Sequence, residues 1–198
     1  MKTRKLAITL ALCLLTLAGV AQKAPQYTED DVKQFYRTII GDYYGYINDS
    51  TAFRVHFTPI WETPENRFQW MYLEASNERN EVVLQKVVEV QPISDKSFNL
   101  VIHGLKDPSV FAGKWANRNF FDGFTTSILK GKSRYTFVKT SDFNYQTSWN
   151  GAKKLGCFPQ GDRVHFKFTQ ENECFYIKRM PKKSTHIIGI NFQKELTD

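Results

Sequence analysis

Alternating apolar and polar positions recur along the chain and predict a protein built mainly from short β-strands. The alternation is clearest in residues 163–169, where Val164, Phe166 and Phe168 share one face. The predicted strands lie near residues 42–48, 53–60, 69–76, 82–90, 97–103, 133–139, 143–149, 163–169, 173–179 and 185–193. About ten strands in mostly hairpin order predict a mainly β fold, an antiparallel calyx-like (lipocalin-like) β-barrel that closes its own edges.

A helical period appears at the start of this region. Thr28 is a good N-cap, acidic residues 29–31 fill the first turn, and Gly41 is a helix terminator. The apolar positions between them follow helical spacing: Val32, Phe35, Tyr36, Ile39 and Ile40. We expect this N-terminal helix to pack against the sheet as a lid or plug. A second, short inserted helix is predicted for residues 109–117, followed by a Phe-rich loop to Leu129.

Residues 69–90 form the central predicted β-hairpin, with a short polar connection between two strands. The faces of the first strand are Trp70, Tyr72 and Glu74 on one side and Met71, Leu73 and Ala75 on the other. Because both faces carry apolar bulk, the pattern is typical of a strand packed on both sides, as in a barrel wall.

The first residues predict a secretory signal peptide. Residues 1–5 are basic, residues 6–17 are apolar, and small residues precede a cleavage site between Ala21 and Gln22. The apolar run is too short to cross a bilayer comfortably, so we expect no membrane span. The predicted organisation is a signal peptide in residues 1–21 and one barrel domain in residues 22–198, in a secreted or periplasmic protein.

Charge and composition add little to this interpretation. The formal net charge of +7 includes three basic residues of the signal peptide, so the mature chain carries +4 (7 − 3). The basic clusters in residues 130–134 and 178–183 are interpreted as solvated turns. Basic and aromatic residues are not interleaved convincingly on one sheet face, and we expect no nucleic-acid partner.

Two cysteines remain after removal of the signal peptide, Cys157 and Cys174. An even count in an exported chain favours a disulfide, which would close a loop of about 18 residues and add about 3 kcal/mol to stability. The alternatives are a metal site and a nucleophilic thiol. No histidine or further cysteine stands at ligand spacing, and no metal site is predicted.

Several segments, in the expected order, resemble the CpcT/CpeT family. Residues 70–75 resemble its aromatic-Leu-Tyr-Val-Glu-Gln-Ala strand, and residues 82–86 resemble its Pro-Tyr-Arg-Gln-Arg strand. Residues 58–61 and 111–115 and the paired cysteines match further segments, so the resemblance covers about residues 33–175. It implies a ten-stranded calyx-like barrel, often dimeric, and, for photosynthetic members, a bilin lyase that attaches a linear tetrapyrrole to a protein cysteine. A bilin or other tetrapyrrole is therefore the candidate cofactor, and a homodimer the candidate assembly.

The central hairpin also supplies the candidate ligand-binding residues. Trp70 and Tyr72 can form a stacking wall. Glu74 lies on the same face and can pair with Lys86 or hydrogen-bond Gln85 across the hairpin. In the functional interpretation these polar groups orient the polar ends of a ligand. In the structural interpretation they form a buried polar pair that only fixes strand register.

No catalytic residue can be assigned, because the chain lacks a nucleophile elbow, a phosphate-binding loop, a zinc-protease motif and a Cys-x-x-Cys pair. We predict an exported, non-catalytic barrel that binds an apolar or tetrapyrrole-like small molecule. A bilin lyase is the first alternative, although a lyase of cytoplasmic light-harvesting proteins has no use for export. A barrel with a filled interior that serves as an interaction or envelope protein is the second.

Overall fold

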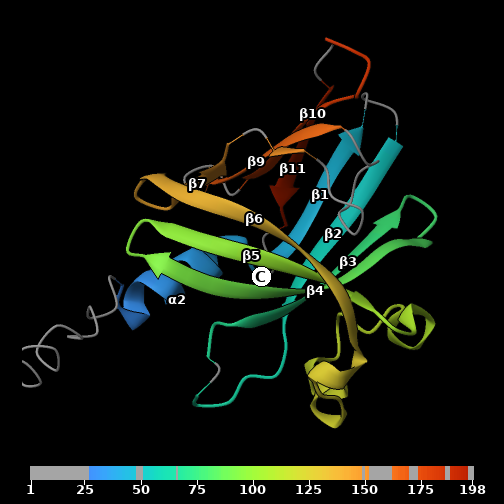
Figure 1. The fold of residues 1–198 in the computed structure, drawn as a ribbon. Coiled ribbons are helices and arrows are strands. Elements are labelled where there is room, and N and C mark those ends of the chain that lie inside the picture. Colours follow the sequence, from blue (N-terminus) through green and yellow to red (C-terminus); the bar gives the residue numbers. More distant parts are fainter. Residues whose placement is uncertain are drawn as a thin grey trace, which may run out of the picture.

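The computed structural model of the protein describes residues 27–47, 51–65, 67–148, 150–151, 162–169, 174–185 and 188–195. In these ranges ten antiparallel strands form a closed barrel, in the order β10-β11-β1-β2-β3-β4-β5-β6-β7-β9, with β9 paired to β10 (Figure 1). Their bounds are β1 Gly41–Ile47, β2 Thr51–Pro59, β3 Trp70–Asn77, β4 Val82–Ser94, β5 Ser97–Leu105, β6 Leu129–Ser141, β7 Asn144–Thr147, β9 Arg163–Thr169, β10 Cys174–Met180 and β11 Ile188–Lys194. A short strand, β8 (Asn150–Gly151), also pairs with β9. The predicted calyx-like barrel is confirmed.

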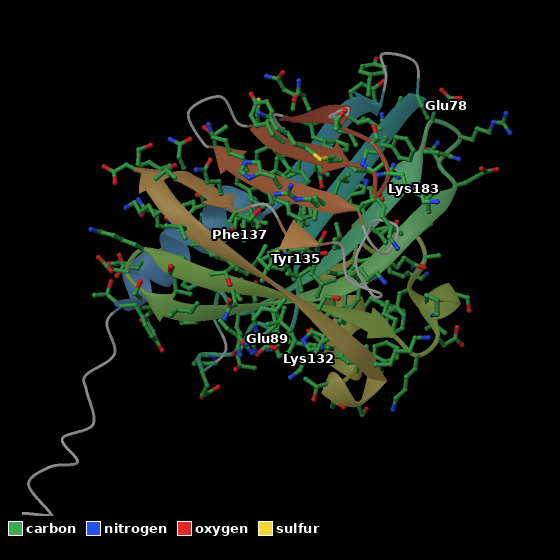
Figure 2. The ribbon with its side chains drawn as sticks, turned by 45° about the horizontal axis from the view of Figure 1, so that its top comes forward. Glu78, Glu89, Lys132, Tyr135, Phe137 and Lys183 are labelled. Carbon is green, nitrogen blue, oxygen red and sulfur yellow. The ribbon has the colours of Figure 1, made fainter. Side chains whose placement is uncertain are left out.

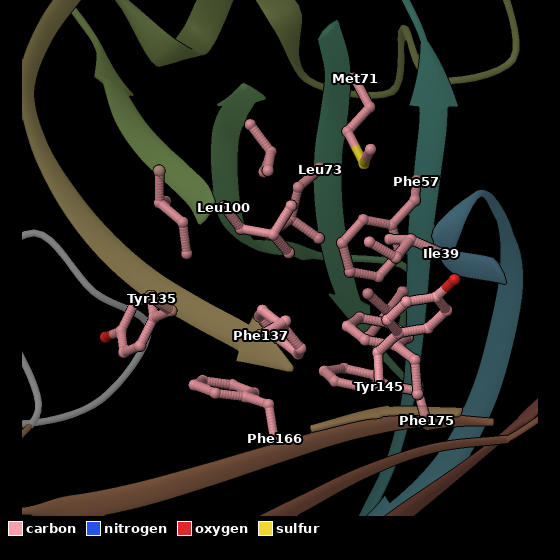
Figure 3. Packing of buried hydrophobic residues seen from close by; sticks show 14 of the residues in the cluster. Ile39, Phe57, Met71, Leu73, Leu100, Tyr135, Phe137, Tyr145, Phe166 and Phe175 are labelled. Atoms are coloured by element: carbon pink, nitrogen blue, oxygen red, sulfur yellow. The ribbon is translucent and has the colours of Figure 1, made fainter. Parts of the chain in front are cut away.

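Strand alternation divides the wall into an inner and an outer face. The inner side chains form one buried apolar core that includes Phe57, Leu73, Leu100, Phe137 and Phe166 (Figure 3). Figure 2 shows Tyr135 and Phe137 on one side of β6, with Lys132 on the other. The aromatic and β-branched residues that gave the strands their propensity therefore also fill the barrel.

The N-terminal helix α2 (Glu29–Ile39) closes one end of this core. Thr28 and Asp31 form a reciprocal capping box, as the sequence predicts. Phe35 enters the barrel and stacks on Phe98 at 4.4 Å between ring centroids, with Tyr145 edge-on at 4.7 Å. The expected plug is confirmed. The helix ends at Ile39, because Ile40 is already extended and Gly41, with φ +138°, begins β1.

Residues 106–128 leave the barrel between β5 and β6 and cover part of its outer face. This segment, here called the outer cover, holds three 3₁₀-helices: η1 Pro108–Phe111, η2 Arg118–Gly123 and η3 Thr126–Ile128. The single helix predicted for residues 109–117 is wrong. Asp107 caps η1, but Ala112 leaves the helical region with ψ 125° and Gly113 has φ +73°, so the helix stops after one turn.

Strand β6 starts earlier than predicted, at Leu129 rather than near residue 133. Gly131, with φ +50°, lies where the register shifts, and this bulge lets Lys130 continue the ladder opposite Gly104. The cluster of basic residues in 130–134, interpreted from the sequence as a turn, is therefore part of the barrel wall.

A buried ion pair ties β10 to the start of β9. Arg179 Nε donates to Asp162 Oδ2 at 2.6 Å, and the Lys182 backbone N–H donates to Oδ1 at 3.0 Å. The Arg179 hydrogen bond holds the pKa of the Asp162 carboxyl below its ordinary value, against the opposing effect of burial, and the Lys182 N–H acts in the same direction.

We expect this pair to make the barrel sensitive to acid. A lowered folded-state pKa gives stability that is present above the unfolded-state pKa, about 3.9, and is lost as pH falls through the folded-state value. Urea unfolding of the wild type and of Asp162→Asn at pH 7 and at pH 3 tests this. The difference in unfolding free energy between the two proteins should shrink in acid. A difference that is the same at both pH values would contradict it.

Some predictions concern residues outside the described ranges. The predicted signal peptide lies there, and so does Cys157. The disulfide between Cys157 and Cys174 therefore stays a prediction. In the described part of the chain, no helix is long and apolar enough to cross a membrane.

Candidate functional site

A row of polar side chains crosses four neighbouring strands on the outer face of the wall. Asp42 on β1 lies opposite His56 on β2, His56 opposite Glu74 on β3, and Glu74 opposite Gln85 on β4. This row is outside the barrel, because the intervening residues of β3, such as Leu73, belong to the inner core. The outer cover lies over it and shields it from water.

Glu74 is the centre of this row and is only 1% exposed. Its Oε2 accepts hydrogen bonds from the Tyr72 hydroxyl at 2.8 Å and from the Gly113 backbone N–H at 2.9 Å. Gln85 Nε2 in turn donates to the Tyr72 hydroxyl oxygen at 2.7 Å. Burial raises the pKa of the Tyr72 hydroxyl far above its ordinary value, so this group stays a neutral donor. The network joins two strands to the outer cover.

Histidine 56 is the second buried member of the row. Its Nδ1 lies 2.8 Å from Asp42 Oδ1, and its ring stacks on Trp115 of the outer cover at 3.6 Å, with 5° between the planes. A His–Asp pair is a common element of general-base catalysis. Here the ring is covered by an indole and His56 is 4% exposed, so little of the ring is open to solvent. The stacking joins the pair to the outer cover.

Aromatic side chains surround the polar row and form a second apolar cluster outside the barrel. Tyr72 packs against Phe121 at 4.8 Å, and Trp61 meets Trp70 edge-on at 5.4 Å. Trp61 Nε1 donates to the Phe121 carbonyl oxygen at 2.8 Å. The buried apolar residues of this cluster are Ile60, Tyr72, Val87, Leu105, Phe111 and Phe121. The outer cover is therefore packed on the wall by a core of its own.

The structure separates the five predicted ligand-binding residues. Trp70, Tyr72, Glu74 and Gln85 share the outer face. Gln85 lies opposite Glu74 but donates to the Tyr72 hydroxyl, which in turn donates to Glu74, so the tyrosine stands between the two groups that were predicted to bond directly. Lys86 does not join them. It lies opposite Leu73, on the inner face, so the predicted pairing of Glu74 with Lys86 is wrong. A side chain one residue further along a strand points to the other side of the wall.

Sequence reasoning missed the Asp42–His56 pair, although a signal was present. The turn-forming sequence Asn48-Asp49-Ser50 between the first two predicted strands sets residue 42 opposite residue 56 in a hairpin, which is the observed register. A second pair, His103 Nε2 to Glu89 Oε2 at 3.1 Å, was missed as well. Among the described residues no three His, Cys, Asp or Glu side chains are grouped closely enough to hold a metal.

The barrel interior holds a small cavity of about 80 Å³. Its lining is entirely apolar: Val55, Phe57, Leu73, Ala75, Leu84, Val88, Leu100, Ile102, Tyr135, Phe137, Phe166, Phe168, Phe175 and Ile177. Figure 3 shows several of these side chains meeting across the lumen. Pockets for drug-sized ligands have volumes of roughly 300–1,000 Å³, and an engineered 150 Å³ cavity takes benzene. The lumen therefore has room only for a slender group.

Comparison with known proteins adds no family to this description. No protein-family model matches the chain, and no curated protein matches it in sequence. The resemblance to the CpcT/CpeT family stays a prediction.

Proposed function

We propose that the protein is a non-catalytic, exported β-barrel that admits a slender apolar chain, such as an alkyl chain, into its lumen. The observation that supports this is the cavity of about 80 Å³ with only apolar residues in its lining. A dry apolar cavity favours an apolar occupant, because water inside it would lack hydrogen-bond partners.

A molecule that fills the cavity should stabilise the protein by a modest amount. An empty cavity costs about 24 cal/mol per Å³ in lost contacts, so 80 Å³ corresponds to about 2 kcal/mol. An alkyl chain of matching width restores those contacts. A linear tetrapyrrole is too wide and brings polar ring nitrogens and propionates that this lining cannot satisfy. We therefore narrow the ligand class from tetrapyrrole-like to single-chain.

A cavity-filling substitution tests the proposal. Ala75 lines the cavity and is buried, so Ala75→Leu should occupy the space that the ligand needs. Binding of 1-pentanol, a chain short enough for the cavity, should be saturable by titration calorimetry in the wild type. It should weaken at least about tenfold in Ala75→Leu, which corresponds to 1.4 kcal/mol.

The matched control is Val83→Leu, an equally apolar enlargement at an exposed position of β4. It should bind pentanol like the wild type. No saturable pentanol binding by the wild type would overturn the proposal and favour a filled barrel that acts through its surface. The homodimer implied by the family resemblance stays a separate prediction, which native mass spectrometry can test.

A further inference from the structure

Two lysines flank a glycine on the inner face of the barrel, beyond the cavity and away from the helical plug. Lys130 on β6 pairs with Gly104 on β5, and the β4–β5 register, in which Val87 pairs with His103, places Lys86 of β4 beside Gly104 on its other side. A Cβ atom at Gly104 would lie 3.3 Å from Lys130 Cγ and 3.6 Å from its Cε, so the lysine chain extends along the inner side of the glycine. Strands are about 4.8 Å apart, which places the Lys86 and Lys130 backbones about 10 Å from each other.

Neither lysine has a counter-ion in the described part of the chain. The inner-facing Arg179 of β10 differs, because Asp162 neutralises it at 2.6 Å. Two like charges next to an apolar lumen repel one another and gain from a bound anion. The inner face at this end of the barrel thus has unbalanced positive charge.

Ser133 adds an unsatisfied polar group at the same place. It lies on β6, on the same inner face as Lys130, opposite the cavity-lining residue Ile102. Ser133 is 6% exposed, and its Oγ has no hydrogen-bond partner. A buried hydroxyl without a partner costs about 1–3 kcal/mol, and a ligand oxygen at this position would satisfy it.

We propose that Lys86 and Lys130 bind the anionic headgroup of a single-chain amphiphile, with Ser133 Oγ as an additional donor and the alkyl chain in the lumen. This inference rests on the proposed function and names its ligand class. The distance along β5 from Gly104 to Ile102, which lines the cavity, is about 7 Å at 3.3 Å per residue. A short chain of about five carbons spans it while its headgroup stays between the lysines.

Three probes with one short chain length separate the headgroup from the chain: pentanoate, 1-pentanol and pentyltrimethylammonium. Pentanoate should bind the wild type at least about tenfold more tightly than pentanol, because hydrogen bonds to charged groups are stronger than neutral ones. The cation should bind more weakly than pentanol. Added salt should weaken pentanoate binding and leave pentanol binding unchanged.

Lys86→Met and Lys130→Met should each weaken pentanoate binding about tenfold and leave pentanol binding unchanged. Lys132→Met is the matched control, because Lys132 lies on the same strand but pairs with His103 on the outer face. It should bind all three probes like the wild type. Circular dichroism checks that each variant is folded.

The outcomes separate this inference from the proposed function. If pentanoate and pentanol bind equally well and the Met substitutions have no effect, the headgroup site is wrong but lumen binding stands. An equal effect of Lys132→Met would mean that only overall charge matters, which also overturns the site. If neither pentanoate nor pentanol binds, both proposals fail.

Discussion

Replacing Phe35 by alanine should lower the free energy of unfolding by about 3–5 kcal/mol, the usual cost of deleting a buried phenylalanine. Phe35 is fully buried and is the residue by which helix α2 enters the barrel. It contacts Phe98, Phe137 and Tyr145, which come from three different strands. The cavity left by the substitution cannot collapse easily, because a closed wall holds these rings apart.

Urea unfolding monitored by circular dichroism measures this loss. Arg37→Ala is the control, because Arg37 is exposed on the same helix and alanine keeps helix propensity. It should change stability by less than about 0.5 kcal/mol. A loss below about 1 kcal/mol for Phe35→Ala would mean that the helix is dispensable for the barrel, contrary to its place in the core.

The elements of this fold could be predicted from the sequence because their signals are local. Thr28 and Asp31 mark the start of the helix, and the alternation of Val164, Phe166 and Phe168 predicts a strand with one buried face. Closure into a barrel was predicted from the hairpin order of the strands. Strand ends were less predictable, since the Gly131 bulge continues β6 through residues whose composition is typical of a turn.

The orientation of the central strand could not be predicted. Both faces of β3 are apolar and both are buried, so hydrophobicity does not tell the inside from the outside. What decides it is the outer cover, whose Gly113 reaches Glu74 over 39 positions of sequence. Contacts between residues so far apart in the sequence leave no periodic pattern of apolar and polar residues. The sequence therefore grouped Trp70, Tyr72 and Glu74 on one face but left open whether that face points into the barrel or away from it.

Lys86 illustrates how neighbouring side chains of β4 alternate between the outer and the inner face of the wall. Its neighbour Gln85 belongs to the buried outer network, while Lys86 lies on the inner face. The sequence prediction grouped them because they are adjacent in the chain and polar. The structure places the first in the outer hydrogen-bond network and the second on the inner face, where the proposed ligand site lies.

Replacing Glu74 by alanine tests this division and should lower the free energy of unfolding by about 2–4 kcal/mol. The substitution removes the two hydrogen bonds that the buried Glu74 carboxylate accepts from the Tyr72 hydroxyl and the Gly113 N–H, and hydrogen bonds to charged groups contribute about 1.5–3 kcal/mol each. Glu74→Gln should cost less, because its amide oxygen can still accept from Gly113. Glu78→Ala, in the exposed turn after β3, is the control and should be nearly neutral.

Ligand binding should not change. Glu74 lies on the outer face, and the cavity lies on the inner face, so Glu74→Ala should bind pentanol with unchanged affinity under conditions where it is folded. Hydrogen exchange of the Gly113 amide should become faster, because the bond that fixes the outer cover to the wall is lost. Unchanged stability together with weaker pentanol binding would place Glu74 at the ligand. Loss of stability with intact binding would establish it as the residue that holds the cover on the barrel.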